Sequence, residues 1–470
     1  MALGVLDRVG GKTGALIIVG SGLHWSWFDA LFMSSFFRMG SPVALMPEIA
    51  TILVFACCIP FCLWILRHKD QCQKLLINGR TVVVFSLLGT IGSLLFVAAS
   101  LAESYCLLVL GGIGAGAYMA FSQMGWCAAY AHQGAKSATP SVSGAFASAI
   151  LFDAVALSML PAISVLLFAS LPLLSGMAFL TMDPAWRSYR TLRAAPSEAP
   201  LQKSRLMAVL RGHLGFSLTL LSALTIVFVC FGYIQHMVSF GGAPGSTPTD
   251  GVLIQVIRGL VAVLLFVSLV FTQVKQGIVY RVGLLLMIAG CLVMPFSLGT
   301  EHFWFCGALI IAGFTAFDIL IYVVFSEVAY ADSESPIKTI ALMRIFTCMG
   351  YCVGAVCAIL LGGVGEKPGP YFMPEATLVG HLMTIATVLM LSGEDFWLVL
   401  GIGAYRVQAT PQQPGNMLET FDRKLDCYNL TARELEIARH IALGRTQSWI
   451  ARELGISENT VGTHVRHIYP

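Results

Sequence analysis

The stretch FWFCGALIIAGFTAFDILIYVVFS, residues 303–326, decides the fold class because it is mostly apolar and carries a single charged residue, Asp318. A helix needs about 20 consecutive apolar residues to cross the hydrocarbon core of a bilayer. The whole chain has the same character, since 57% of its 470 residues are hydrophobic and only 11% are charged. Soluble domains carry about 25% charged residues, so the composition excludes an ordinary soluble protein.

Apolar runs of this length recur along the chain and predict about twelve spanning helices. Only Pro161 separates the fifth run from the sixth, and Gly393-Glu394-Asp395 interrupts the last, so eleven or thirteen helices stay open. We therefore expect an all-α protein, a polytopic helix bundle in the lipid bilayer. The runs are 14–37, 43–66, 80–101, 105–130, 142–158, 161–182, 213–237, 251–274, 278–298, 303–326, 338–362 and 376–405.

Lysine and arginine residues are concentrated in alternate loops, and cytoplasmic loops of membrane proteins are enriched in both. With a cytoplasmic N-terminus, only Arg38 and Lys367 fall in outside loops. We therefore expect a multi-pass protein of the bacterial plasma membrane with both termini in the cytoplasm. The inside loops would hold Arg8, Lys12, Arg67, Lys69, Lys74, Arg80, Lys136, Arg187, Arg190, Arg193, Lys203, Arg205, Arg211, Lys275, Arg281 and Lys338.

The basic loop 183–212 divides the membrane region 1–405 into two halves, residues 14–182 and 213–405. Residues 406–427 include a Pro- and Gln-rich linker, and a polar segment, 428–470, follows. Six helices, a long inside loop and six more helices resemble the major facilitator fold. The acidic-and-arginine signature of that family is reduced here to Arg67-His68-Lys69-Asp70 and Arg80. The resemblance therefore concerns architecture and does not by itself assign a function.

Charged side chains inside the predicted spans are the candidate site of the membrane region. A charge at mid-membrane costs about 2.5–3.5 kcal/mol on insertion scales, so each needs a partner or a function. If the two halves pack as in the major facilitator fold that they resemble, helices five and eight meet, which implies an Asp153–Arg258 pair. Asp318 and Arg344, on neighbouring helices, are predicted to pair within one half. A ligand pocket and purely structural ion pairs are both consistent with the sequence. The predicted pocket residues are His24, Trp25, Asp29, Asp153, Arg258, Asp318 and Arg344.

Two features that suggest a cofactor site are better explained by packing. The run Gly111-Gly112-Ile113-Gly114-Ala115-Gly116 lies in an apolar helix, where small residues let helices approach closely. Most of the 13 cysteines lie in apolar runs, and no CxxC pair occurs. The sequence also contains no Walker motif, metal-ligand spacing or nucleophile elbow. We expect no cofactor, no metal and no enzymatic activity.

The polar segment 428–470 predicts three short helices. Thr431 is a good N-cap with Glu434 three residues on, as a capping box requires, and Gly444 ends this helix. Thr446 and Ser457 are suited to cap the second and third helices. Two short helices joined by a glycine-containing turn describe a helix-turn-helix. The predicted inward faces are Leu435, Ala438, Ile441 and Ala442, then Ile450, Ala451 and Leu454, then Val461, Val465 and Ile468.

This segment resembles the LuxR-type helix-turn-helix family. The matched positions are Leu430-Thr431-x-Arg433-Glu434, Ile441-Ala442-x-Gly444 and Ile450-Ala451-x-x-Leu454-x-Ile456-Ser457-x-x-Thr460-Val461-x-x-His464. The resemblance implies that residues 457–469 form a recognition helix that enters the major groove of double-stranded DNA. Arg466 is then the predicted guanine contact, and His464 a packing and capping residue more than a reader. The implied DNA-binding residues are Thr446, Gln447, Ser457, Thr460, Gly462, Thr463, His464, Arg466 and His467.

Three positions depart from the family pattern. Gly462 stands where the family has lysine, and Trp449 stands where an acidic residue is common. The sequence ends at Pro470, where the family continues into a fourth helix used for dimerisation, so either the chain is truncated or it pairs differently. Five arginines against four glutamates in 428–470 predict modest non-specific affinity for DNA.

The sequence thus predicts a membrane-embedded bacterial transcription regulator gated by a small molecule that the transmembrane domain senses. Its expected partners are double-stranded DNA, the lipid bilayer, the unidentified signal and a second copy on DNA. The alternative is a secondary transporter with a regulatory or vestigial DNA-binding-like tail. A third interpretation is a constitutive DNA binder tethered to the membrane.

Overall fold

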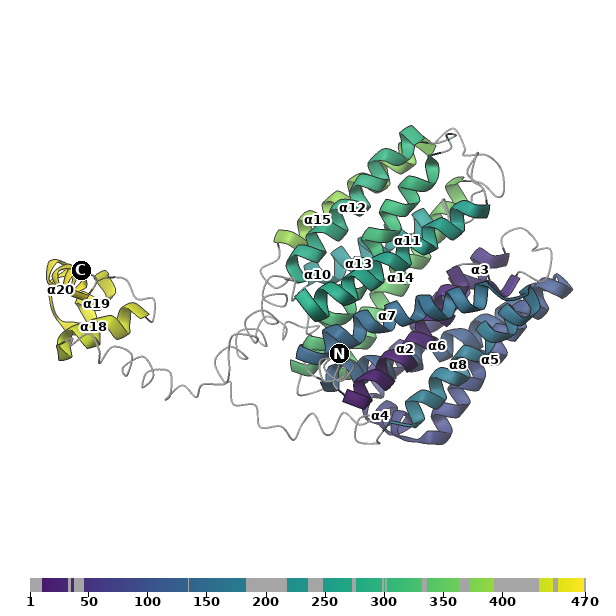
Figure 1. Cartoon of the computed structure of the whole chain (residues 1–470), viewed down its shortest axis with the longest axis horizontal. Helices are drawn as coiled ribbons and strands as arrows, with labels where there is room; N and C mark the ends of the chain where they lie inside the picture. The colour runs from purple at the N-terminus through teal and green to yellow at the C-terminus, as the bar shows by residue number, and fades with distance from the viewer. Residues whose placement is uncertain are drawn as a thin grey trace. The chain divides into compact units, whose positions relative to one another are not determined.

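The computed structural model forms two compact units, Met1–Ala404 and Tyr405–Pro470, each described here by itself (Figure 1). All regular structure in the described residues is helical. The predicted loop 183–212, the linker 406–427 and Thr446 lie outside the described residues. The structure describes residues 11–32, 35–37, 46–133, 135–182, 218–235, 248–272, 276–297, 300, 302–331, 336–362, 372–392, 431–442 and 447–468.

Twelve helices of 18 or more residues stand in the described part of the first unit, one for each predicted apolar run. The first six are α2 (Gly11–Phe32), α3 (Met46–Arg67), α5 (Gly79–Ala102), α6 (Tyr105–Gln133), α7 (Ala135–Leu157) and α8 (Pro161–Leu180). The second six are α10 (Leu218–Gln235), α11 (Pro248–Val267), α12 (Gln276–Ser297), α13 (Phe303–Ala331), α14 (Pro336–Gly362) and α15 (Phe372–Ser392). Shorter elements are η1 (Ser35–Phe37), α4 (Lys69–Ile77) and the π-helical turn η5 (Ser268–Thr272).

The composition of these helices suits a bilayer. Over the described residues, 8 helices are long and apolar enough to cross a membrane, and three more segments, in α10, in α11 with η5, and in α12, are shorter apolar helices. Large apolar side chains cover the outside of the unit: Phe296 is 81% exposed and Leu360 76%. Water would penalise such a surface, whereas lipid tails solvate it. The chain is a multi-pass membrane protein.

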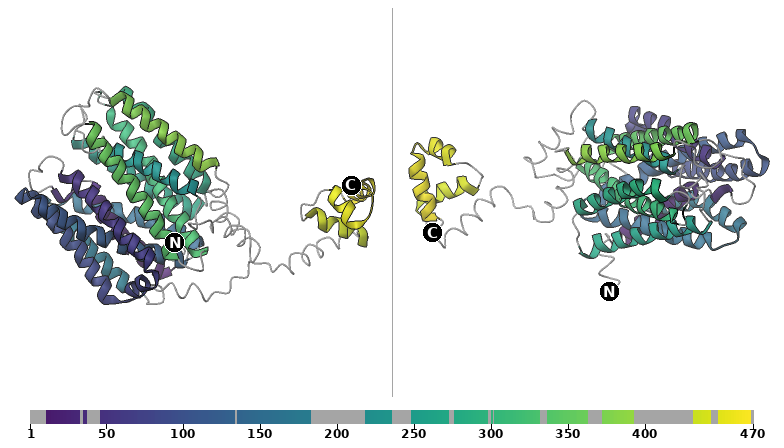
Figure 2. Two further views of the ribbon diagram at one scale, coloured as in Figure 1. Left: turned by 180° about the vertical axis from the view of Figure 1, so that it is seen from behind. Right: turned by 90° about the horizontal axis from the view of Figure 1, so that it is seen from above.

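The two groups of six helices pack in the same way (Figures 1 and 2). In the first group α2 contacts α7 and α8, while α6 contacts α3 and α5. In the second, α10 contacts α14 and α15, while α13 contacts α11 and α12, so each pair recurs six helices later. The groups meet where α7 contacts α11 and where α3 contacts α14. The predicted contact between the fifth and eighth spanning helices is therefore confirmed.

The glycine run predicted to serve packing does so between α5 and α6. A Cβ at Gly111 would lie 2.9 Å from the carbonyl oxygen of Gly92 and from the ring of Phe96. A Cβ at Gly92 would lie 2.8 Å from the carbonyl oxygen of Gly111 and from the amide of Ala115. Any side chain here would force the two backbones apart, which is the role that small residues have between membrane helices.

The boundary between α7 and α8 agrees with the prediction, whereas the start of α7 differs from it. Pro161 occupies the first turn of α8, where its missing N–H leaves no helical bond unmade, and so separates α7 from α8 as expected. The fifth helix, predicted to begin at 142, instead begins at Ala135. Polar residues there fit the helix because they are internally satisfied: Ser143 is buried and its hydroxyl donates to the carbonyl of Thr139. Of the last predicted run, residues 393–405 lie outside the described residues.

The second unit contains α18 (Ala432–Ala442), α19 (Gln447–Leu454) and α20 (Glu458–Ile468). Its small apolar core is formed by Ile437, Ile450, Ala451 and Val461, with Leu454, Ile456 and Val465 packed against it. The predicted inward face of α18 is corrected in one respect, because Ile437 is fully buried whereas Leu435 is only partly so. The buried stripe therefore runs through Ile437 and Ala438.

Candidate nucleic-acid interface and candidate ligand cavity

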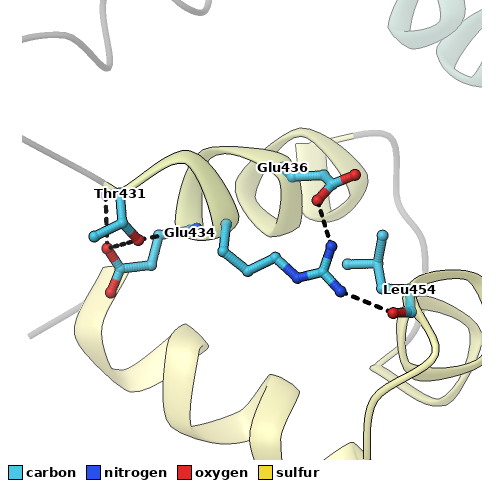
Figure 3. A network of polar contacts seen from close by, with 5 residues as sticks. Thr431, Glu434, Glu436 and Leu454 are labelled. Carbon is cyan, nitrogen blue, oxygen red and sulfur yellow. Dashed lines mark hydrogen bonds and ion pairs between the residues drawn. The ribbon is translucent and has the colours of Figure 1, made fainter.

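The predicted capping box is present at the start of α18 (Figure 3). The Thr431 amide and hydroxyl donate to Glu434 Oε2 at 2.9 and 2.7 Å. The Glu434 amide in turn donates to Thr431 Oγ1 at 3.3 Å. Such reciprocal bonds satisfy amides that have no partner within the helix. The bonds from Thr431 also hold the pKa of the Glu434 carboxyl below its ordinary value.

The turn between α19 and α20 is fixed at both of its ends. Gly455 has φ +63°, a left-handed conformation that ends α19 without steric cost, and the Ile456 amide donates to the carbonyl of Ala451 at 3.0 Å. Ser457 then caps α20, since its Oγ accepts from the Thr460 amide at 3.1 Å. The cap at Ser457 therefore fixes where α20, the helix predicted to enter DNA, begins, and the turn at Gly455 fixes its direction relative to α19.

Arg433 links the first helix to the end of the second (Figure 3). Its guanidinium donates to Glu436 Oε2 at 2.7 Å and to the carbonyl oxygen of Leu454 at 2.8 Å. The last carbonyls of a helix have no hydrogen-bond donor within the helix and carry partial negative charge. The Arg433 guanidinium supplies both a donor and a positive charge at this end of α19. Sequence analysis identified Arg433 as a signature residue but missed this role, because the bond spans two helices.

The predicted DNA-binding residues lie mostly on α20. Ser457, Thr460 and Thr463 are exposed, while Gly462 and His464 are half-buried. The Thr463 hydroxyl donates to the carbonyl of Asn459 at 2.9 Å, one turn earlier on the same helix. The half-burial of His464 is compatible with the packing role predicted for it.

The predicted DNA-binding set also includes His467, Gln447 and Arg466. The ring of His467 lies 3.5 Å from Glu434, which directs it toward α18. Gln447 begins α19 and Arg466 lies in α20. Their side chains lie outside the described atoms, as does Thr446 altogether.

In the membrane unit, the buried charges pair in an arrangement that sequence analysis did not predict. Arg258 on α11 forms an ion pair with Asp29 on α2 at 2.6 Å, not with Asp153. Asp153 on α7 instead accepts a hydrogen bond of 2.6 Å from Ser26 Oγ. The predicted Asp153–Arg258 pair is therefore wrong. The Asp29–Arg258 pair joins the two groups of helices, one residue from each.

The predicted Asp318–Arg344 ion pair is also not formed. Arg344 is buried and donates to Tyr322 Oη at 2.9 Å and to Cys348 Sγ at 3.6 Å. Its guanidinium carbon lies 5.9 Å from the centre of the Phe55 ring, a cation–π distance. Asp318 shows no ion pair of 4 Å or less with any described residue.

A cavity lies between the two groups of helices. Most of its wall is aromatic. The first group contributes Trp25, Phe28, Phe32 and Phe55, and the second contributes Phe228, Phe231, Phe314 and Tyr322. The polar groups at the wall are Gln235, Arg258, Asp318 and Arg344. Apolar clefts with a few fixed polar groups are typical of small-molecule sites.

The cavity thus brings together four of the seven predicted pocket residues, Trp25, Arg258, Asp318 and Arg344. Asp29 and Asp153 do not line it, since they are directed to Arg258 and Ser26. His24 turns toward α6, where its Nδ1 is 3.1 Å from Ser122 Oγ and 3.3 Å from Tyr118 Oη. The aromatic lining was the part that sequence analysis missed. Phenylalanine is so common in membrane helices that the sequence does not show which phenylalanine side chains point into a cavity and which point toward lipid.

Among the described residues, no group of three or more histidine, cysteine, aspartate or glutamate side chains has the geometry of a metal site. Twelve cysteines are described and all are free thiols.

Comparison with known proteins agrees with both halves of this description. Residues 428–470 match the family of bacterial regulatory proteins, luxR family. The C-terminal segment is therefore a LuxR-family helix-turn-helix domain, the class of domain that binds DNA in transcription regulators. No curated protein matches the chain significantly.

The membrane unit is similar in fold to solved major facilitator transporters. The proton:xylose symporter XylE bound to 6-bromo-6-deoxy-D-glucose matches with TM-score 0.60 at 13% identity, covering 82% of this chain and 95% of that one. A partially occluded inward-open form of the xylose transporter XylE from E. coli matches with TM-score 0.51 at 14% identity, covering 81% and 98%. The chain thus combines a major facilitator fold with a LuxR-type domain.

Proposed function

We propose that the protein is a non-enzymatic, membrane-embedded transcription regulator whose α20 reads DNA and whose membrane unit senses a small molecule. The observation that carries the proposal is the presence, in one chain, of a capped LuxR-type helix-turn-helix and of an aromatic cavity with a few polar groups between two helix groups. Both termini lie in the cytoplasm, as the distribution of lysine and arginine indicates.

On DNA, α20 enters the major groove. Arg466 bonds the O6 and N7 atoms of a guanine, and Gly462 and Thr463 face neighbouring bases or phosphates. Thr446, Gln447 and Thr460 hold the backbone, which positions the domain without selecting the sequence. A second copy binds the adjacent half-site. Because the domain is attached to the bilayer, DNA must approach the membrane to be bound.

Signalling follows from where the cavity lies. Residues of both helix groups line it, so a bound molecule contacts both at once. A ligand shifts a conformational equilibrium by as much as its affinities for the two states differ. A molecule that binds one arrangement of the two helix groups more tightly would therefore increase the population of that arrangement, in the same chain that carries the DNA-binding domain.

The test is promoter occupancy by chromatin immunoprecipitation in the native cell, for the wild type and for Arg466→Ala. The proposal predicts specific sites for the wild type and loss of occupancy at those sites for the variant, since one bidentate base contact contributes about 1–3 kcal/mol. Absence of occupancy in both would contradict it. A variant that keeps all sites would remove Arg466 from the reading role.

A secondary transporter with a regulatory tail is the second candidate, favoured by the twelve long helices of the described residues and by the cavity between their two groups. Uptake of a labelled molecule into vesicles by a chain ending at residue 405 would distinguish the two. Uptake at a rate that saturates would favour the transporter, whereas binding without uptake would favour the sensor.

A further inference from the structure

The cavity wall carries one cation, Arg344, that no described carboxylate contacts. Its side chain is 2% exposed, its two hydrogen-bond partners, Tyr322 and Cys348, are neutral, and its Nε has none. A guanidinium carries five N–H donors and keeps its charge under all ordinary conditions. Arg344 therefore presents a positive charge with no described carboxylate within 4 Å, and an unbonded Nε–H, at a site that excludes most water.

The second arginine at the cavity is not equivalent. Arg258 is held by Asp29 at 2.6 Å, so most of its charge is already compensated. An anion that enters the cavity would have to compete with Asp29 at Arg258, whereas no described carboxylate lies within 4 Å of Arg344. The difference between the two arginines assigns the anion-binding role to Arg344.

The aromatic side chains define the rest of the ligand. Phe231 and Phe314 stack in parallel with ring centres 3.5 Å apart, and Trp25 meets Tyr322 edge to face at 4.7 Å. Flat aromatic molecules fit such surfaces because rings gain energy from stacked and edge-to-face contacts beyond simple burial of area. The aromatic side chains of the wall come from both helix groups, so a planar ligand in the cavity would contact rings of both.

Asp318 limits how many acidic groups the ligand carries. Its carboxylate also lines the cavity and makes no ion pair of 4 Å or less with a described residue. A second acidic group near Asp318 would find no free cation among the described residues of the cavity wall, because Arg258 is already paired with Asp29. A hydroxyl or amino group there would find an acceptor.

We propose that the cavity binds a small aromatic molecule with a single carboxylate, which is held by Arg344 while the ring lies among the aromatic side chains of both helix groups. This inference rests on the proposed function, since such a molecule would be the signal that the regulator senses. Planar recognition of a carboxylate by two parallel N–H bonds is a property of arginine that lysine lacks.

The test is isothermal titration of the purified full chain in lipid nanodiscs, without DNA. The probes are benzoate, phenylacetate, 3-phenylpropionate and indole-3-acetate, each compared with its uncharged primary amide. Phenethylamine and cyclohexylacetate serve as the cationic and the saturated analogues. At least one aromatic acid is expected to bind tenfold or more tightly than its amide and than both analogues. If no acid binds more tightly than its amide, or if the amine binds best, the proposal is overturned.

Arg344→Gln is expected to lower the affinity for the best acid at least tenfold and to leave that of its amide unchanged. Arg344→Lys, which keeps the charge, should retain part of the affinity and decides the matter if the glutamine variant does not fold. Tyr233→Phe is the matched control, since it removes a buried hydrogen bond to Glu375 away from this cavity. Equal loss for acid and amide in Arg344→Gln would contradict the role of Arg344. A chain that binds the acid but occupies no promoter would refute the proposed function and leave this inference intact.

Discussion

The membrane unit and the helix-turn-helix unit place their polar and apolar groups in opposite ways. The membrane unit exposes large apolar side chains such as Leu160, which is 70% exposed, and buries charges such as Asp29 and Arg344. In the described part of the second unit, large apolar side chains are buried or half-buried, while Ser457, Glu458 and Asn459 are exposed.

The difference shows that one rule operates in two solvents. In water, apolar burial supplies the driving force, so even a core as small as Ile437, Ile450 and Val461 organises three helices once their ends are capped. In lipid, helices gain little from burying apolar surface. Close backbone approach at positions such as Gly92 and internal satisfaction of polar groups take over.

The largest effect is expected from Arg258→Gln, which leaves the Asp29 carboxylate buried without its partner. Breaking a buried ion pair by removing one member costs about 3–5 kcal/mol. Thermal unfolding in nanodiscs should therefore show a strongly destabilised protein. The double variant Asp29→Asn with Arg258→Gln should be more stable than Arg258→Gln alone. A single variant as stable as the wild type would mean that this pair is not structural.

In the small unit, the largest effect should come from Arg433→Met, which removes the bond to the Leu454 carbonyl. Hydrogen bonds to charged groups contribute about 1.5–3 kcal/mol. Hydrogen exchange of α18 and α19 in the full chain should become faster by the corresponding factor. Glu436→Gln is the control, because it leaves the bond to Leu454 in place. Equal exchange in both variants would contradict the bridging role.

Gly92→Ala tests close helix approach in the membrane unit. The added methyl would meet the backbone of α6 at 2.8 Å, and overpacking of this kind costs about 1–3 kcal/mol. A lower midpoint of thermal unfolding in nanodiscs is the expected result. Gly380→Ala is the matched control, since its nearest neighbouring atom is 3.6 Å away. Similar midpoints for the two variants would show that α5 and α6 can separate without cost.

Thr431→Ala and Ser457→Ala each remove an N-cap of the small unit and should cost about 1 kcal/mol. Hydrogen exchange should rise mainly in α18 for the first variant and in α20 for the second. An equal rise of hydrogen exchange in all three helices for both variants would mean that these caps do not define the helix ends. Thr431→Ser should show hydrogen exchange of α18 close to that of the wild type, because the hydroxyl is kept.

The smallest effect is a dependence on pH. The folded-state pKa of Glu434 is lowered by the bonds from Thr431, so its stabilisation is complete above the unfolded pKa of about 4.3 and is lost as pH falls through the folded value. Exchange of α18 should therefore accelerate, relative to intrinsic rates, as pH is lowered below that range. Glu434→Gln should abolish this dependence. An unchanged dependence in the variant would assign it to another group.

Local features of this molecule could be predicted from sequence, and relations between helices could not. The capping box at Thr431, the break at Pro161 and the glycine contact of α6 each depend on a few adjacent residues, and all three are confirmed. The partner of Arg258 depends on the rotation and depth of α2, α7 and α11 together, so the sequence predicts Asp153 where the structure has Asp29. The bond from Arg433 to the end of α19 and the aromatic wall of the cavity were missed for the same reason.

The most direct test of the central claim is the location of the C-terminal domain. Fusions of alkaline phosphatase and of green fluorescent protein after residue 470 report opposite sides of the membrane. Fluorescence without phosphatase activity is the expected result, and it would place α20 on the same side of the membrane as the chromosome. Phosphatase activity without fluorescence would place the domain outside the cell, and no version of the proposed function would survive that result.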